Sequence, residues 1–320
     1  MPRNTKKKIV VIGGGTGSFV VLRGLKKYPF DITAVVTMFD SGGSSGVLRD
    51  EFGVLPPGDA RRCLVALSEG EKEATLRNLF NFRFNNKESS LHGHNFGNLL
   101  LTALTHIKTN EAEAIKEAGE LLNIEGKVLP VSLNKAQLCA ELEDGTIIEG
   151  ETNIDIPAHN GELKIKKVFL RPRAFVFEET AKAIREADMI VIAPGDLYTS
   201  IIPNLLVEGV PEAIKANKGI TVYVLNLMTK WGETHGFKAS DFSRTALSYM
   251  GVLSFDYIIY NTKSFPTQLV DAYFVEKKHP IIIDEKLKKY GRKLIAKDVY
   301  DDASILRHDS DKLGAIVAGL

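Results

Sequence analysis

The stretch KIVVIGGGTGS, which runs from Lys8 to Ser18, decides the fold class of this chain. Its first part, Lys8–Ile12, is an apolar run of the kind found in strands buried within a parallel sheet. Glycines follow at once, and Ser18–Lys27 then has the pattern of a helix. A strand, a glycine-rich turn and a helix predict the opening of a crossover unit. In such a unit, backbone N–H groups and the positive end of the helix face an anion.

The rest of the chain continues this alternation of strands and helices. Further strands are expected at Ile32–Thr37, Met189–Ala193, Ile220–Leu225, Tyr257–Tyr260 and Pro280–Ile283. Further helices are expected at Ala60–Leu67, Ala74–Phe82, Phe96–Ile107, Glu111–Leu122 and Asp311–Leu320. The alternation predicts an α/β fold with a Rossmann-like, doubly wound and mostly parallel sheet.

One segment, from about residue 127 to residue 170, has a different character. It holds short alternating runs and a turn signal at Asp144-Gly145, which together favour a small β-rich insertion. The short runs are Leu138–Leu142, Ile147–Glu149 and Leu163–Leu170. No internal repeat or linker divides the sequence, so we expect residues 1–320 to form one α/β domain that carries this insertion.

Composition excludes several classes of protein. The 320 residues include 41 Lys and Arg against 40 Asp and Glu, a net charge of +1, which argues against a nucleic-acid-binding surface. Cys63 and Cys139 form no C-x-x-C pair, so they suit a reducing compartment. The apolar run after the basic start is too short for a signal peptide, and none approaches the ~20 residues of a membrane helix. We therefore expect a cytoplasmic protein without membrane insertion.

The first glycine loop is the first candidate site. It supplies Gly13, Gly14, Gly15, Thr16 and Gly17 as candidate ligand-binding residues. The dinucleotide fingerprint requires glycine or alanine where this chain has Ser18, and the lysine of a P-loop is absent. Binding of phosphate is favoured over a tight turn with no ligand, but the loop alone does not name the ligand.

A second loop follows the second strand and is also rich in donors. Asp40 stands where the acidic residue of a dinucleotide enzyme binds ribose, and glycines and serines come next. The candidate ligand-binding residues here are Asp40, Ser41, Gly42, Gly43, Ser44 and Ser45. Since the carboxyl ends of adjacent strands meet at one edge, the two loops predict a ligand with more than one anionic group.

Other polar residues after strands or before helices complete the candidate set. These are Asp59, Arg61, His94, Asn98, Gly195, Asp196, Ser200, Asn204, Asn226, Thr229 and Arg307. A capped helix with surface arginines explains Asp59 and Arg61 equally well, and a salt bridge explains Arg307 equally well. His94 has only His92 beside it as a metal ligand, so we expect no metal site. No catalytic residue can be assigned.

Taken together, these loops resemble the YvcK-like gluconeogenesis factors, which share a superfamily with CofD, the phospholactate transferase of deazaflavin synthesis. The resemblance covers essentially the whole chain. It rests on IGGGTGS (Ile12–Ser18), DSGGSSGVLRDEFG (Asp40–Gly53), LPPGDARR (Leu55–Arg62), HGHNFGNLLLTAL (His92–Leu104), PGDLYTSIIPNLLV (Pro194–Val207), NLMTKWGET (Asn226–Thr234) and LRHD (Leu306–Asp309).

The resemblance implies a binding factor for nucleotide sugars of the UDP-N-acetylglucosamine type. It further implies a part in cell shape and peptidoglycan supply during growth on gluconeogenic carbon, with cell-wall synthesis or regulatory proteins as partners. The glycine loops would hold the diphosphate, and Asp40 a ribose or sugar hydroxyl. Asn204, Asn226 and Thr229 would supply the remaining polar contacts. Whether the protein is an enzyme or forms a homo-oligomer stays open.

Two alternatives remain at this point. The first is a CofD-type transferase, which moves phospholactate from a nucleotide diphosphate carrier to a deazaflavin with magnesium held by acidic residues such as Asp40 and Asp59. Against it, the transferases carry an acidic stretch where this chain has SGGSSG. The second is an NAD-dependent oxidoreductase, which rests on the first loop and Asp40 but lacks an evident hydride-transfer constellation.

The chain departs from the YvcK pattern at four positions. Ser41 replaces a second aspartate, which weakens a metal role for that pair. Asp196 replaces a serine, and Lys230-Trp231 replaces glutamine-proline. We expect the charge of Lys230 to offset that of Asp196 across the pocket.

Overall fold

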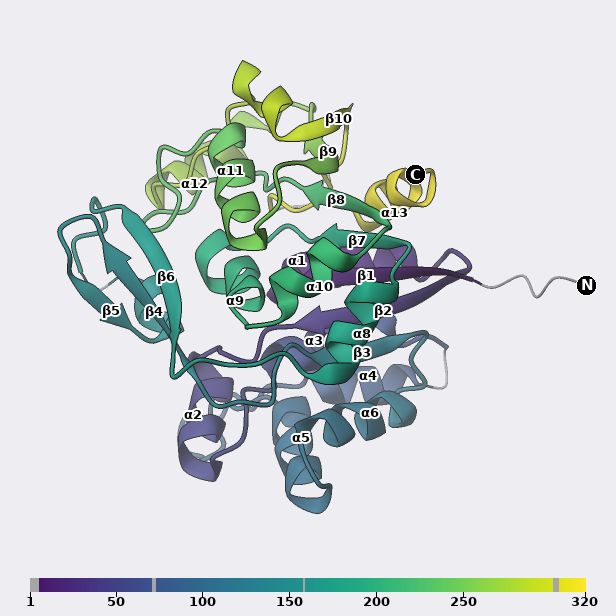
Figure 1. The fold of residues 1–320 in the computed structure, drawn as a ribbon. Coiled ribbons are helices and arrows are strands. Elements are labelled where there is room, and N and C mark those ends of the chain that lie inside the picture. Colours follow the sequence, from purple (N-terminus) through teal and green to yellow (C-terminus); the bar gives the residue numbers. More distant parts are fainter. Residues whose placement is uncertain (1–5, 71–72, 158, 302–304) are drawn as a thin grey trace, which may run out of the picture.

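A computed structural model describes residues 6–70, 73–157, 159–301 and 305–320, and it is built on a parallel sheet (Figure 1). The described strands of this sheet lie in the order β10-β9-β8-β7-β1-β2-β3. Their bounds are β1 (Lys7–Gly13), β2 (Phe30–Val36), β3 (Lys127–Pro130), β7 (Met189–Ile192), β8 (Ile220–Val224), β9 (Phe255–Asn261) and β10 (Gly291–Lys297). All the pairings are parallel, which confirms the predicted fold class.

Helices cover both faces of the sheet, because the strand residues that point to one face and those that point to the other are both apolar. Ile9 and Val11 of β1 join one core, with α1 (Gly15–Leu25), α3 (Gly58–Leu67), α5 (Phe96–Ile107), α6 (Glu111–Leu121) and α13 (Ser310–Ala318). Val10 and Ile12 join the other core, with α8 (Glu178–Glu186), α9 (Ile202–Leu205), α10 (Val210–Ala216) and α11 (Ala239–Met250). This double burial explains why Ile9–Ile12 is apolar throughout.

A second, antiparallel sheet lies beyond the carboxyl ends of the main strands (Figure 1). Its order is β5-β4-β6, and its bounds are β4 (Gln137–Leu142), β5 (Ile147–Glu149) and β6 (Ile165–Arg171), with α7 (Glu151–Asp155) between β5 and β6. The first strand after residue 126, β3, instead pairs with β2 at the edge of the main sheet. The small sheet therefore begins later than the segment that the sequence pattern marked out.

The strand order reverses direction between β1 and β7, which is the feature that positions a ligand site. From β1 the chain moves outward through β2 and β3, and from β7 it moves the other way through β8, β9 and β10. At such a switch point the loops after neighbouring strands diverge and leave a crevice at the carboxyl edge. Here the crevice opens after Gly13 of β1 and Ile192 of β7.

Two sequence-based assignments of elements were wrong. Gly43–Phe52 forms helix α2, so the second half of the predicted glycine–serine loop is helical. The carboxylate of Asp40 accepts the N–H of Gly42 at 2.7 Å just before this helix and offsets its poor intrinsic propensity. The predicted strand Pro280–Ile283 is absent, and Pro280 makes only an isolated bridge to Met228. The basic segment Gly291–Lys297 is the edge strand instead.

The remaining described elements are α4 (Ala74–Asn81), α12 (Thr267–Val275), the π-helix η1 (Leu197–Ile201) and the 3₁₀ helix η2 (Glu285–Lys289). Asn95 caps α5 by accepting the N–H of Asn98 at 3.2 Å. In the part of the chain that the structure describes, every helix is too short or too polar to span a bilayer.

Candidate ligand-binding site

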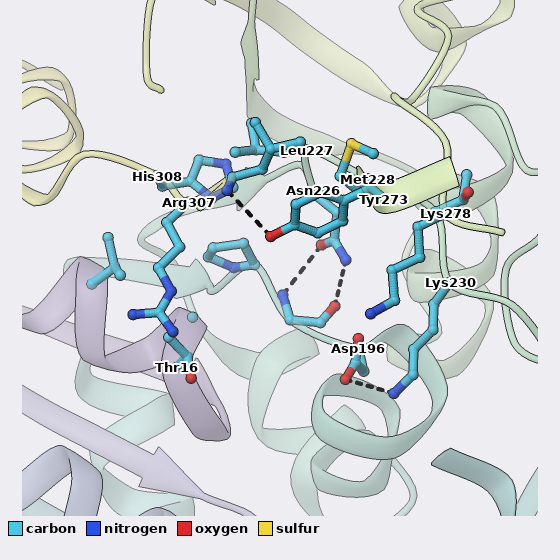
Figure 2. A pocket seen from close by; sticks show the side chains of 16 residues that line it. Thr16, Asp196, Asn226, Leu227, Met228, Lys230, Tyr273, Lys278, Arg307 and His308 are labelled. Carbon is cyan, nitrogen blue, oxygen red and sulfur yellow. Dashed lines mark hydrogen bonds and ion pairs between the residues drawn. The ribbon is translucent and has the colours of Figure 1, made fainter. Parts of the chain in front are cut away.

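A cleft of about 250 Å³ lies at the switch point, where the loops after β1, β7 and β8 meet the C-terminal tail (Figure 2). Sequence-predicted residues in its lining are Thr16, Gly17, Gly195, Asp196, Asn226, Thr229 and Arg307. Residues that sequence reasoning did not select also line it, among them Tyr273, Lys278 and His308. Three loops far apart in the sequence thus form one concave polar surface.

The glycines of the first loop are required by close approach and by backbone conformation. A Cβ on Gly17 would lie 1.6 Å from the carbonyl oxygen of Pro194, so only glycine lets α1 pack on the loop after β7. Gly15 has a φ of +61°, which favours glycine. Its N–H donates to a carboxylate oxygen of Asp59 at 2.8 Å. The loop therefore brings the N-terminus of α1 to the cleft and fixes it there.

The C-terminal tail is anchored so that Arg307 faces the cleft. The neighbouring His308 is buried, and its Nε2–H donates to the carbonyl oxygen of Leu225 at 3.1 Å. Burial lowers the pKa of His308 to about 4, so this ring is neutral and makes the bond as a fixed tautomer. The N–H of Leu306 donates to the hydroxyl of Tyr273 at 3.2 Å. Figure 2 shows the Arg307 side chain extending toward Thr16.

Two cations enter the cleft from opposite sides. Arg307 comes from the tail, and Lys278 comes from the segment after α12 (Figure 2). Thr16 at the start of α1 lies beside Arg307, whereas Lys278 lies on the side of the cleft that holds Asp196 and Lys230 (Figure 2). Positive side chains and a helix N-terminus around one small cavity suit a ligand that carries phosphate groups.

Asn226 and Thr229 hold the walls of the cleft in place. The amide of Asn226 donates to the Gly195 carbonyl at 2.6 Å and accepts the Gly195 N–H at 3.2 Å. The hydroxyl of Thr229 accepts the N–H of His279 at 3.0 Å. Both side chains already have protein partners, so in this structure their role is to position the loops.

Lys230 lies at the centre of a cluster of three carboxylates beside the cleft. Its ammonium is 2.9 Å from Asp196 and 3.0 Å from Glu233, and it also contacts Asp155 of α7. The predicted pairing of Lys230 with Asp196 is thus confirmed. The acidic trio has ligand atoms close enough together to hold a metal ion, but the Lys230 ammonium already pairs with all three carboxylates.

Burial controls the ionisation of this cluster. The Glu233 side chain is fully buried, and burial raises its pKa. Burial by itself would lower the pKa of Lys230, but the charges of Glu233, Asp196 and Asp155 raise it above the usual range. Glu233 also accepts the N–H of Tyr198 at 3.2 Å and the hydroxyl of Thr199 at 3.2 Å. The cluster therefore ties the small sheet, η1 and the cleft together through one permanently charged lysine.

A second polar group lies on the other side of the first loop, where the segment after β2 meets α7. The N–H of Ser41 donates to Glu151 at 3.3 Å, and the hydroxyl of Ser41 donates to Thr152 at 3.0 Å. Asp40 lies close enough to raise the pKa of Glu151, although burial is the larger cause of that rise. Ser41, which replaces an aspartate of the family pattern, thus links the main sheet to the small one.

Asp59 joins this polar group to the first loop. Burial raises the pKa of Asp59 to about 6, and the negative charge of Asp40 adds to the rise. The N–H of Gly15 and the charge of Arg62 partly oppose it. Carboxyl groups at this position are thus held where ionisation is costly.

The stability of the unliganded protein should consequently fall as the pH rises through 6. The pKa of Asp59 is about 6 when folded against 3.8 ordinarily, so the folded state holds the proton more tightly and loses that advantage above pH 6. Asp59→Asn keeps an acceptor for Gly15 but never ionises. We expect it to be more stable than wild type by about 1–2 kcal/mol at pH 8, with no difference near pH 4.

Urea unfolding at the two pH values, with chelator present, measures this difference. Asp271→Asn, an exposed carboxylate on α12, serves as the control and should show no such change. Equal stability of wild type and Asp59→Asn at pH 8 would show that the carboxylate is charged at no cost.

Several predicted site residues serve the interior of the protein. Arg61 is buried and donates to Asn98 at 3.0 Å, to the Phe80 carbonyl at 3.2 Å and to Asn81 at 3.0 Å. Its neighbour Arg62 is the arginine that reaches the first loop, where it donates to the hydroxyl of Thr16 at 3.2 Å. Sequence position alone could not tell these two apart, because adjacent helix residues point in directions about 100° apart.

Of the other predicted residues, some make contacts between α2 and α5 or the segment before it, and others lie beside the cleft or in the glycine loops. Ser44 is 3.3 Å from a ring nitrogen of His94, and the Asn98 amide donates to Ser45 at 3.4 Å. Beside the cleft, the fully buried Asn204 donates to the Ser200 carbonyl at 2.9 Å. Gly13 and Gly14 belong to the first loop, and Gly42 and Gly43 open α2.

Sequence reasoning missed Asp155, Glu151, Tyr273 and Lys278. None lies in a glycine-rich motif or directly after a strand of the main sheet. Two of them come from α7 of the small sheet and two from α12 and the segment after it. Only the acidic residues in ETNID (Glu151–Asp155) could have indicated a polar site in the sequence, and acidic residues are equally typical of an exposed helix start.

Comparison with known proteins shows the family to which the chain belongs. A family model described as 2-phospho-L-lactate transferase CofD matches residues 9–300. The gluconeogenesis factor of Halalkalibacterium halodurans is 46% identical over 318 residues, which cover 98% of this chain and 97% of that protein. The gluconeogenesis factor of Bacillus subtilis is 42% identical over 318 residues, which cover 98% of each.

A solved structure extends the agreement to the backbone. The crystal structure of a UPF0052 family member from Bacillus halodurans matches with a TM-score of 0.91 at 45% identity. The match covers 98% of this chain and 99% of that one. On this similarity along nearly its whole length, the chain belongs to the CofD-like family, together with the proteins named gluconeogenesis factors.

Proposed function

We propose that this protein is a cytoplasmic binding factor for a nucleotide sugar of the UDP-N-acetylglucosamine type. In this proposal the bound protein supports growth and normal cell shape on gluconeogenic carbon, by acting on cell-wall synthesis or regulatory proteins. The observation that carries the proposal is the cleft at the switch point. There Arg307 lies beside Thr16 at the N-terminus of α1, and Lys278 faces them from the other side of the cleft (Figure 2).

Charge and the mixed polar and apolar lining both support a nucleotide diphosphate carrier. Loop N–H groups at Thr16 and Gly17 offer donors for phosphate oxygens, and Arg307 offers a planar fork with the same geometry. Leu227 and Met228 add an apolar wall for a base or sugar ring. The names of the relatives, which refer to gluconeogenesis, supply the physiological part of the proposal.

Titration calorimetry with UDP-N-acetylglucosamine tests the proposal, with NAD and GDP as competitors. Arg307→Gln should weaken binding at least tenfold, because a hydrogen bond between charged groups contributes about 1.5–3 kcal/mol. Bound ligand should also raise the unfolding free energy, by about 2.7 kcal/mol at one hundred times the dissociation constant.

Arg292→Gln is the matched control. Arg292 lies on the edge strand β10, is exposed and pairs with the carboxylate of Asp256 on β9. It should bind the nucleotide sugar as wild type does. Binding of NAD alone, or equal affinity in wild type and Arg307→Gln, would refute the proposed site.

A CofD-type transferase is the second candidate, favoured by the family model that matches residues 9–300. Such an enzyme uses magnesium, and two carboxyl groups near the first loop fit it: Asp59 accepts the N–H of Gly15 at 2.8 Å, and Asp40 lies close enough for its charge to raise the pKa of Asp59. Asp40 and Asp59 would hold the ion, which would supply charge neutralisation for a diphosphate. Stabilisation by a deazaflavin together with GDP and magnesium, but not by the nucleotide sugar, would favour this candidate.

A further inference from the structure

A second polar cavity, of about 590 Å³, lies between β6 of the small sheet and α11 on the main sheet. The N–H of Val168 on β6 donates to the Tyr249 hydroxyl on α11 at 2.9 Å, which holds the two walls together. Its size is that of cavities that bind small molecules. No residue of this groove lines the cleft at the switch point.

The groove has an excess of positive charge. Lys164, Lys166, Lys167 and Arg244 line it, together with one carboxylate, Asp241. Lys166 and Lys167 share the single carboxylate of Glu141, at 2.6 and 3.0 Å. The carboxylate of Glu143 also accepts the N–H of Lys164 at 3.2 Å, so four cations face three carboxylates, which leaves a net charge of about +1, opposite in sign to a phosphate monoester near pH 7.

Two of the cations have capacity for a further anion. Lys164 has no ion-pair partner among the residues that the structure describes. Arg244 donates to one oxygen of Asp241 at 3.0 Å, and the other oxygen of Asp241 accepts the Lys238 N–H at 3.1 Å. A guanidinium has five N–H donors, so Arg244 can hold an incoming phosphate while keeping its partner.

The remaining wall offers hydroxyl groups and an aromatic floor. Tyr198, Thr245, Ser248 and Tyr249 line the groove, with Phe237 among the apolar residues. Burial raises the pKa of Tyr249, so its hydroxyl keeps the proton and can donate it while accepting from Val168. Hydroxyls beside a cationic wall are the groups that hold the hydroxyls and the phosphate of a sugar phosphate.

We infer that this groove is a second ligand site, which binds a phosphate monoester of a sugar. The phosphate contacts Lys164 and Arg244, and the sugar hydroxyls contact Thr245 and Tyr249. The groove meets the small sheet, a part of the fold that the nucleotide-sugar proposal leaves without a ligand. The inference therefore stands whether or not the cleft binds a nucleotide sugar.

Titration calorimetry with glucose 6-phosphate tests the inference, with glucose and inorganic phosphate as separate probes. The double variant Lys164→Gln/Arg244→Gln should bind glucose 6-phosphate at least tenfold more weakly than wild type, given two lost charge-assisted contacts of about 1.5 kcal/mol or more each. Wild type should bind glucose 6-phosphate more tightly than either separate probe. Thermal unfolding of the variant confirms that it folds.

The matched control is Lys182→Gln/Arg185→Gln on α8, which also removes an exposed lysine and an arginine paired with a carboxylate on its own helix. It should bind glucose 6-phosphate as wild type does, and so should Arg307→Gln, which disables only the cleft. Saturating UDP-N-acetylglucosamine should leave the affinity unchanged.

Three results would overturn the inference. They are unchanged binding in the double variant, loss of glucose 6-phosphate binding in Arg307→Gln, and no binding to wild type at millimolar concentrations. Equal affinity for inorganic phosphate and glucose 6-phosphate would likewise contradict a site that reads the sugar.

Discussion

Replacing Gly17 with alanine should destabilise the protein by about 3 kcal/mol and abolish binding in the cleft. The added Cβ would lie 1.6 Å from the carbonyl oxygen of Pro194, a contact between two backbones that no rotamer change relieves. The loop after β7 and the start of α1 would have to separate, and both line the cleft. The gain in helix propensity from alanine, about 1 kcal/mol, is too small to offset this cost.

Thermal and urea unfolding measure the first effect, and a fall of about 6–12 °C in the melting temperature is expected from 3 kcal/mol. Gly319→Ala is the matched control, because the nearest atoms to its Cβ would be 3.5 Å away and its φ is −84°. It should unfold as wild type does. If Gly17→Ala matched Gly319→Ala in both stability and ligand binding, the close packing of α1 on the Pro194 loop would not matter for the site.

Replacing Lys230 with glutamine should cost about 3–5 kcal/mol of stability near neutral pH. The substitution leaves Asp155, Asp196 and Glu233 without their shared counter-ion, and Glu233 is fully buried. Because burial already raises the pKa of Glu233, its carboxylate takes up a proton more readily as the pH falls. The loss of stability should therefore become smaller toward pH 5, which is the opposite of the trend expected for an exposed charge.

Adding Asp196→Ser to Lys230→Gln tests the same cluster by rescue. The double variant restores the residues expected from the family pattern, serine and glutamine, and removes one of the three uncompensated charges. Its stability should lie between the single variant and wild type, as urea unfolding at pH 7.5 would show. Lys8→Gln, which breaks an exposed pair with Glu186, should change little. A Lys230→Gln protein as stable as wild type at pH 7.5 would rule out the cluster as a stabilising element.

Much of the fold could be predicted from residues 8–18 and the alternation after them. The buried strands were predicted because β1, β7 and β8 are apolar on both faces, and short continuous apolar runs of this kind are typical of strands in a parallel sheet. The edge strand β10 was not predicted because it carries Arg292, Lys293 and Lys297 and is mostly exposed, so it lacks the apolar run of a buried strand. Helix α2 was not predicted because glycine and serine disfavour a helix unless tertiary contacts hold it, as the contacts of Ser44 with His94 and of Ser45 with Asn98 do here.

The residues of the candidate site were likewise predicted only in part. Motifs placed after strands pointed to Thr16, Gly195 and Asp196, since parallel strands bring their carboxyl ends to one edge, and the LRHD motif of the C-terminal tail pointed to Arg307. Lys278 could not be found, because α12 and the segment after it carry no pattern that relates them to the switch point. The sequence also could not show that Arg61 points to the interior and Arg62 to the first loop, because the orientation of the helix decides this.

By itself, the sequence determined the α/β class, the glycine loops and the family, because short-range sterics and double burial leave a mark on consecutive residues. Only the tertiary structure decided which polar residues share a cavity. It placed Arg307 beside the start of α1 with Lys278 across the cleft, and it gathered three carboxylates on Lys230. The physical reason is that such contacts join loops that are distant in the chain. Their meeting depends on strand order, and no local pattern of residues encodes the reversal between β1 and β7.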